Sequence, residues 1–140
     1  MPHAQAYIHT AWRETSPGWL LALAAMLGFR HPANGPLAIC DLACGTGYSA
    51  ALTAACVPSA TVDGFDADAG HIETAERLAR SATLGNIRFD TADIRRLAND
   101  PPRTYDIIVV HGVLSWVQPD VREAIFRFAG SALKLSLIHI

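Results

Sequence analysis

Apolar residues along the chain gather in short runs, separated by longer segments with helical signals. Four short runs are interpreted as strands, and they cover residues 37–42, 60–65, 87–89 and 105–111. The fourth run is almost wholly apolar, as is typical of a parallel strand buried on both faces. The helical segments cover residues 18–29, 48–56, 69–82 and 119–134, with a short helical turn after Asp93. Strands that alternate with helices predict an α/β fold with a parallel, doubly wound sheet.

Local signals support these boundaries. Ser16 followed by Pro17 is typical of a helix start, with serine as the N-cap and proline in the first turn. Asp68 is well placed to cap the helix that begins at residue 69. Residues 30–36 contain two prolines, a glycine and an asparagine, and therefore predict a loop.

The first strand runs into a glycine-rich turn. Ligands of doubly wound sheets bind at the carboxyl ends of the strands. At this place the sequence has Asp41, Ala43, Cys44, Gly45 and Gly47. Glycine allows the backbone to turn tightly and to approach a ligand closely. We expect these five residues to contact a cofactor.

Acidic residues follow the second and third strands. Asp66 can accept two hydrogen bonds from a ribose diol, or it can form a turn; because Asp68 is the better cap, ribose binding is favoured. Ala67 is small enough to lie against an adenine ring. After the third strand, Asp93 can accept from an adenine amino group while Ile94 flanks the ring, or Asp93 can cap the helical turn.

The fourth strand ends at His111. As a general base, its imidazole would be well matched to neutral pH. The alternative is that only the His111 backbone matters and that the ring packs against the next loop, and we favour this alternative. Trp116 is interpreted as a packing anchor in preference to a platform for an acceptor.

Composition limits the classes of partner. The chain has 140 residues, of which 51% are hydrophobic and 17% charged, and a net charge of −2, which fits one domain with a real core. This charge balance gives no reason to expect a nucleic-acid or membrane partner. The three cysteines include no C-x-x-C pair, so we expect no metal site. The N-terminus lacks the features of a signal peptide, and we expect a cytoplasmic protein.

Taken together, these residues resemble a known family. Residues 39–47 resemble the first motif of class I S-adenosylmethionine-dependent methyltransferases, and Asp66 and Asp93 fall where that family has its second and third acids. Residues 111–124, beginning His-Gly-Val-Leu-Ser-Trp-Val, resemble bacterial methyltransferases that carry a separate C-terminal regulatory domain. The resemblance covers residues 16–134 and implies a Rossmann-like doubly wound parallel sheet.

The resemblance also implies roles for individual residues. Asp41 would orient the methionyl amino group of S-adenosylmethionine, and Gly45 and Gly47 would line its amino-acid moiety. Asp66 would bind the ribose, and Asp93 with Ile94 the adenine. The His111 carbonyl would face the methionyl amine.

Two other functions fit parts of the pattern. Residues 45–50 match G-x-G-x-x-A, so an NAD-dependent oxidoreductase is the first alternative. Against it, a carboxylate at Asp41 would repel a dinucleotide pyrophosphate. The second alternative is a non-catalytic nucleotide-binding module. For a methyltransferase, the sequence leaves the acceptor, a small molecule or a protein, and the oligomeric state open.

The C-terminal residues do not continue the family pattern. Residues 135–140, Leu-Ser-Leu-Ile-His-Ile, are what CTGTCTCTTATACACATC encodes, which matches a transposase adaptor used to build sequencing libraries. We therefore expect residues 1–134 to be the N-terminal part of a methyltransferase domain and residues 135–140 to be a non-native tail. The sheet is then expected to be truncated after the fourth strand and its helix, leaving that strand at an open edge and the fragment inactive.

Overall fold

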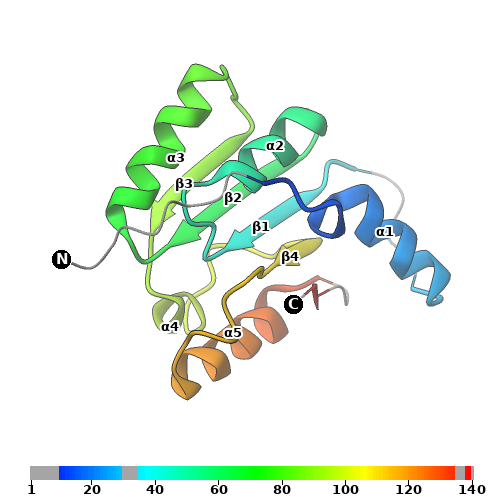
Figure 1. Ribbon diagram of the computed structural model, residues 1–140. Helices are drawn as coiled ribbons and strands as arrows, with labels where there is room; N and C mark the ends of the chain where they lie inside the picture. Colours follow the sequence, from blue (N-terminus) through cyan, green and yellow to red (C-terminus); the bar gives the residue numbers. More distant parts are fainter. Residues whose placement is uncertain (1–9, 30–34, 135–137, 140) are drawn as a thin grey trace.

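One parallel sheet forms the centre of the molecule (Figure 1). The computed structural model describes residues 10–29, 35–134 and 138–139. Within these residues the strands are β1 (Ala38–Leu42), β2 (Thr61–Asp66), β3 (Ile87–Thr91), β4 (Ile107–Val109) and β5 (Ile138–His139). They lie in the order β3-β2-β1-β4-β5, and all neighbours are parallel. The predicted α/β fold is confirmed.

Helices cover both faces of the sheet, as the alternation predicts. The helices are α1 (Pro17–Met26), α2 (Tyr48–Cys56), α3 (Ala69–Ser81), α4 (Ile94–Leu97) and α5 (Pro119–Ala132), and a short 3₁₀ helix, η1, spans Arg13–Thr15. Figure 1 shows α4 and α5 on one face and α2 and α3 on the other. Side chains alternate along the strands, so β1 sends Cys40 and Leu42 into the core under α5 and Ile39 into the core under α1 and α2.

Capping residues set the helix boundaries. The Ser16 hydroxyl accepts a hydrogen bond from the Trp19 N–H at 3.4 Å, and Asp68 accepts from the Gly70 N–H at 2.7 Å, which confirms both predicted caps. The first helix ends at Met26, three residues earlier than predicted, because Gly28 adopts a φ of 84° and the Phe29 N–H bonds back to the Ala24 carbonyl at 2.9 Å. Most of the predicted loop at residues 30–36 lies outside the described residues.

The four expected strands form the parallel sheet, and residues after α5 make further backbone contacts at the outer edge of β4. The chain leaving α5 returns along β4: the Tyr105 N–H donates to the Ala132 carbonyl at 2.7 Å, and the Lys134 N–H donates to the Tyr105 carbonyl at 2.8 Å. Further along, β5 pairs in parallel with residues 108 and 109 of β4. Backbone groups at a buried strand edge need partners, and Ala132, Lys134 and β5 supply some of them. Of residues 135–140, only 138 and 139 lie within the described part of the chain.

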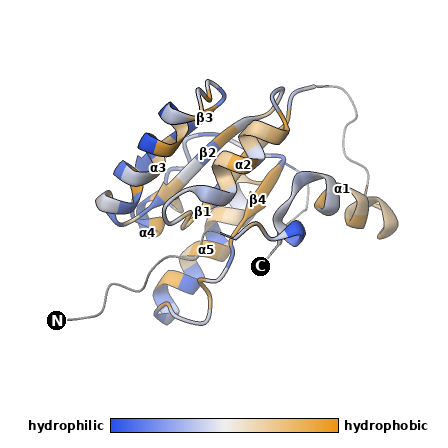
Figure 2. Ribbon diagram, turned by 45° about the horizontal axis from the view of Figure 1, so that its top comes forward, coloured by the Kyte–Doolittle hydropathy of each residue, from blue (hydrophilic) through white to orange (hydrophobic). Residues whose placement is uncertain are grey.

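The distribution of hydropathy follows the layers (Figure 2). Hydrophobic colour runs along β4 and α2, whereas α3 alternates between hydrophilic and hydrophobic positions. On α3 the buried residues are Ile72, Ala75 and Ala79, one face of the helix. No helix in the described residues is long and apolar enough to cross a membrane.

Candidate functional site

A cavity of about 990 Å³ opens where β1 and β4 end. Its floor includes Asp41 of β1 and Val109 of β4. The strand order places β1 between β2 and β4, whose helices lie on opposite faces of the sheet. Ligands of open parallel sheets bind at such a point, so this cavity is the candidate site.

The turn after β1 has a backbone that depends on glycine. Ala43, Gly45 and Gly47 have φ values of 61°, 56° and 74°. A Cβ on Gly47 would lie 2.5 Å from the Ala75 Cβ and 2.7 Å from the Phe89 ring, so no other residue fits there. Ala43 and Cys44 line the cavity, whereas Gly45 and Gly47 hold the turn in place below it.

Asp41 is a buried acid at the floor of the cavity. Only 8% of the residue is exposed. Burial, and secondarily the nearby carboxylate of Asp66, raise the pKa of Asp41 from 3.8 to about 7. Among the described residues, no group donates a hydrogen bond to its carboxylate and no cation pairs with it. The negative charge of this buried carboxylate is therefore not balanced by any of the described residues. Burial, followed by Asp41 and Asp66, also raises the pKa of the neighbouring Cys44 thiol.

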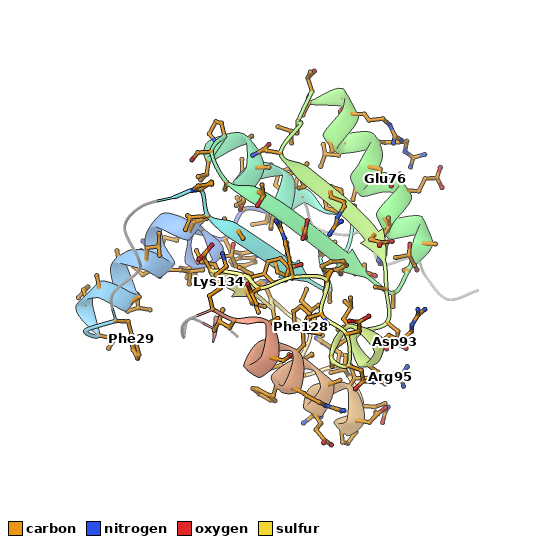
Figure 3. All side chains as sticks on the ribbon, turned by 180° about the vertical axis from the view of Figure 1, so that it is seen from behind. Phe29, Glu76, Asp93, Arg95, Phe128 and Lys134 are labelled. Carbon is orange, nitrogen blue, oxygen red and sulfur yellow. The ribbon has the colours of Figure 1, made fainter. Side chains whose placement is uncertain are left out.

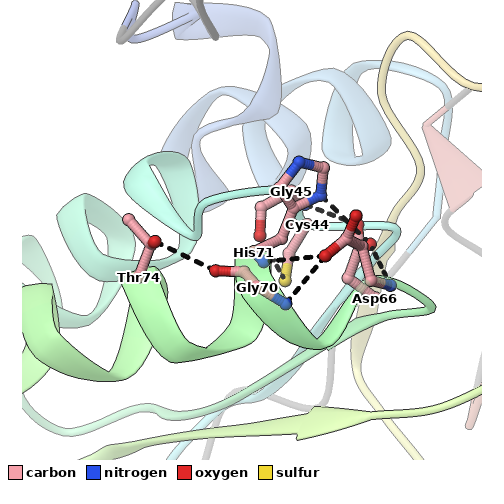
Figure 4. A network of polar contacts seen from close by, with 7 residues as sticks. Cys44, Gly45, Asp66, Gly70, His71 and Thr74 are labelled. Atoms are coloured by element: carbon pink, nitrogen blue, oxygen red, sulfur yellow. Dashed lines mark hydrogen bonds and ion pairs between the residues drawn. The ribbon is translucent and has the colours of Figure 1, made fainter. Parts of the chain in front are cut away.

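Asp66 lies at the end of β2, outside the cavity lining. Its Oδ2 accepts from the Gly45 N–H at 2.8 Å, and its Oδ1 accepts from the Asp68 N–H at 2.9 Å. Figure 4 shows the His71 ring and the Gly45 N–H converging on this carboxylate, with His71 Nδ1 3.3 Å from Asp66 Oδ1. Asp66 thus links the glycine turn to the start of α3. His71 lines the cavity, although the sequence interpretation did not single it out.

The residues expected at the adenine lie away from the cavity. Ala67 is exposed, and neither it nor Asp93 or Ile94 lines the cavity. Asp93 caps α4 by accepting from the Arg95 N–H at 2.8 Å, and the two side chains lie next to each other (Figure 3). The Arg95 guanidinium donates to Asp93 and also to Asp120 of α5. These hydrogen bonds from Arg95 hold the pKa of Asp93 below its usual value. The capping alternative is thus realised in the structure, whereas adenine binding stays a prediction.

His111 lies in the wall of the cavity. Its ring centroid is 5.4 Å from that of Trp12, with the rings tilted by 35°, so the segment before α1 packs over this wall. Trp116 also lines the cavity and is 86% exposed, so its interpretation as a packing anchor is wrong. The sequence interpretation missed Trp12 and Thr15, because η1 is too short to produce a periodic pattern.

The structure thus gathers part of the expected cofactor set. Asp41, Ala43, Cys44 and His111 share one cavity. The other expected residues do not line it; they are Gly45, Gly47, Asp66, Ala67, Asp93 and Ile94.

Comparisons with known proteins bear on the family to which the chain belongs. The chain is 38% identical over 96 residues to an uncharacterized protein of Synechocystis, a match covering 69% of this chain and 19% of that protein. It is 36% identical over 93 residues to a malonyl-[acyl-carrier protein] O-methyltransferase of Halalkalibacterium halodurans, covering 63% of this chain and 32% of that enzyme. The solved structure of PKMT2 from Rickettsia typhi in complex with AdoHcy superimposes with a TM-score of 0.86 at 25% identity.

Each of these matches covers a larger share of this chain than of the other protein. The Rickettsia match covers 92% of this chain but 25% of that protein, and the chain spans between about a fifth and a third of the two curated relatives. A model of the methyltransferase domain matches residues 39–135, which include β1 to β4, the glycine turn and α5. The chain therefore belongs to the family of class I S-adenosylmethionine-dependent methyltransferase domains.

Proposed function

We propose that residues 1–134 form the cofactor-binding part of a methyltransferase that transfers a methyl group from S-adenosylmethionine to an acceptor still to be identified. Family membership and the AdoHcy bound by the Rickettsia protein support the choice of cofactor. The resemblance of residues 111–124 favours the bacterial subgroup with a C-terminal regulatory domain.

The uncompensated Asp41 carboxylate carries the proposal. A buried carboxylate without a partner is costly, and its pKa rises so that it can be neutral. A ligand with a positive charge removes that cost by pairing with the ionised form. S-adenosylmethionine carries an α-ammonium group and a sulfonium, whereas the pyrophosphate of a dinucleotide would meet repulsion at the same place.

The remaining residues fit a ligand of this class. The cavity volume of about 990 Å³ is at the upper end of the range for small-molecule sites. The glycine turn lets backbone approach the ligand without a Cβ in the way. The cofactor, when bound, supplies a methyl group already activated as a sulfonium, so the protein needs only to bind, shield and align.

Different residues around the cavity bind the ligand and cover the cavity wall. Asp41 binds the ammonium end. Trp12, whose ring lies 5.4 Å from that of His111, covers part of one wall. We assign the His111 ring this packing role and do not assign it proton transfer.

A thermal-shift comparison tests the proposal. S-adenosylhomocysteine at 100 times its Kd should stabilise the protein by about 2.7 kcal/mol, and NADH at the same concentration should leave the Tm unchanged. Stabilisation by NADH alone would favour the oxidoreductase and overturn the proposal.

A further inference from the structure

Large apolar side chains on the surface are concentrated on α1 and the turn that ends it. Nine large hydrophobic residues are exposed in the described part of the chain, and five of them fall within residues 19–29. Exposed apolar residues that are scattered need no explanation, whereas a contiguous group of them marks an interaction surface. We call this group the α1 face; its members are Trp19, Leu23, Met26, Leu27 and Phe29, with 43%, 39%, 85%, 67% and 49% of each residue exposed.

The α1 face belongs to a helix that has no polar side. Residues 16–29 contain no charged residue, and within α1 only Pro17, Leu20 and Ala24 are buried. Figure 1 shows α1 at the side of the sheet, and Figure 2 shows hydrophobic colour along it. A helix that is apolar on all sides is normally buried on all sides. The described fold covers one side of α1, so the other side is suited to a partner.

The area of the α1 face sets the strength of such a contact. A large apolar or aromatic side chain has on the order of 200 Å² of surface, so the exposed fractions leave roughly 500 Å² in contact with solvent. Two copies that cover this area would together bury roughly 1,000 Å², the lower limit for a specific interface. We therefore expect a dissociation constant in the micromolar range.

Charge favours a second copy over a lipid surface. At the rim, the Arg13 guanidinium lies 4.9 Å from the centre of the Trp19 ring and pairs with Glu14 at 3.1 Å. The rim is thus balanced in charge, and two identical faces can meet without repulsion. Helices that lie on membranes combine an apolar face with a polar face rich in lysine and arginine. Residues 16–29 contain neither lysine nor arginine.

The shape of the helix surface also suits a pair. A row of small exposed residues lies beside the row of large ones at helical spacing. When two copies are related by a two-fold axis, the large side chains of one copy can pack over the small residues of the other. The small residues are Gly18, Ala22 and Ala25.

We propose that two copies of this chain associate through the α1 face, as a pair related by a two-fold axis. None of the five residues of the α1 face lines the cavity. The inference therefore goes beyond the proposed function and does not depend on it.

Self-association as a function of concentration tests the proposal. Sedimentation velocity of the 140-residue chain across the micromolar range should show a monomer that converts to a dimer. Met26→Glu places a charge on the most exposed residue of the α1 face, and covering an unpaired charge is costly. The variant should therefore dimerise at least about tenfold more weakly.

Two further variants make the test specific to the α1 face. Ala22→Glu introduces a charge at another exposed position of the same helix and should weaken dimerisation in the same way, so the result does not rest on the folding of one variant. Phe126→Glu is the matched control, because Phe126 is 50% exposed on α5, and α5 covers the other face of the sheet. Its dimerisation should be unchanged within about twofold. Thermal unfolding verifies that each variant is folded.

The remaining outcomes would overturn the inference. A chain that stays monomeric across this range does not use the α1 face to pair. A dimer that both α1 variants leave intact is formed elsewhere, for example at the outer edge of the sheet. An equal loss in Phe126→Glu would show a general effect of added charge. Binding of the monomer to phosphatidylcholine vesicles, abolished by Met26→Glu, would assign the α1 face to a lipid surface instead.

Discussion

Asp41 on β1 and Asp63 on β2 are both almost fully buried, with 8% and 4% of each residue exposed, yet their surroundings are opposite. Asp63 Oδ2 accepts from the Tyr105 hydroxyl at 2.9 Å, Arg103 Nε at 2.9 Å and Arg88 Nη2 at 3.2 Å. Asp41 has no hydrogen-bond donor or cation among the described residues, and the charge that acts on it is that of another carboxylate, Asp66.

The difference separates an acid that joins parts of the fold from an acid whose charge the described residues leave unbalanced. Asp63 faces the α5 side of the sheet, as Phe65 does, and its donors come from β3 and from the segment that leads into β4. It therefore joins three neighbouring parts of the fold. Asp41 faces the opposite side and opens into the cavity. A buried carboxylate that the protein compensates contributes to folding, and one that it leaves uncompensated is available to a cationic ligand.

The largest expected effect is on the free energy of unfolding, when the Asp63 carboxylate is removed. Asp63→Ala leaves Arg103 and the fully buried Tyr105 without their shared acceptor. Because the two arginines are partly exposed, we expect a loss of about 3 kcal/mol, the lower end of the range for breaking a buried pair. Unfolding in urea without cofactor measures the free energy of unfolding. A loss below about 1 kcal/mol would contradict the structural role of Asp63.

Asp41→Asn should have the opposite pattern. It removes the charge that pairs with the ligand ammonium, so affinity for S-adenosylhomocysteine should fall about thirtyfold, or about 2 kcal/mol. In the folded protein the pKa of Asp41 is raised above its unfolded value, so ionising Asp41 costs stability as the pH rises from about 4 to 7. The variant avoids that cost. At pH 8 its free energy of unfolding should equal or exceed that of the unmodified protein, and a clear decrease would be evidence that Asp41 is a structural acid like Asp63.

The same ionisation makes cofactor binding depend on pH. Below pH 7 Asp41 is largely protonated, and binding of the ammonium group requires loss of that proton. Affinity for S-adenosylhomocysteine should therefore rise about fivefold between pH 6 and pH 7, as the ionised fraction of Asp41 rises. Calorimetric titration across this range, repeated with Asp41→Asn, measures the slope. A slope that persists in the variant would assign the titration to another group.

A smaller and more local effect distinguishes Asp66 from Asp68. Asp66→Ala removes the contacts to Gly45 and His71 and should weaken binding of S-adenosylhomocysteine by at least about tenfold. Asp68→Ala removes the cap of α3 and should cost about 1 kcal/mol of stability while leaving affinity nearly unchanged. Titration and thermal unfolding of both variants check the contrast. If Asp68 proves the costlier loss for binding, the cap rather than the Asp66 carboxylate controls the site.

Features that depend on neighbouring residues could be predicted from the sequence. The strands follow from apolar runs, the caps at Ser16 and Asp68 from residue type and place, and the glycine turn from Gly45 and Gly47. These signals are local, because a few consecutive residues decide each conformation. The positions of Asp41 and His111 at one cavity follow from the rule that parallel strands end at the same edge.

Features that depend on distant residues could not be predicted in the same way. Asp63 accepts hydrogen bonds from Arg103 and Tyr105, which lie about forty positions later in the chain. No pattern in the intervening residues indicates these contacts. His71 reaches the cavity because two aspartates orient the start of α3. The return of the chain along β4 requires backbone pairing between residues on either side of α5. Such contacts become visible only when the elements are assembled.

The exposure of Trp116 has an optical consequence. The chain contains three tryptophans, and two of them, Trp12 and Trp116, line the cavity, with 50% and 86% of each residue in contact with solvent. A solvated indole emits at longer wavelength than a shielded one, so a ligand that covers either ring shifts the emission to the blue or quenches it. The cavity thus contains its own fluorescent reporters, and Trp116→Phe assigns the signal to one wall. Acceptors can be screened in this way without a label.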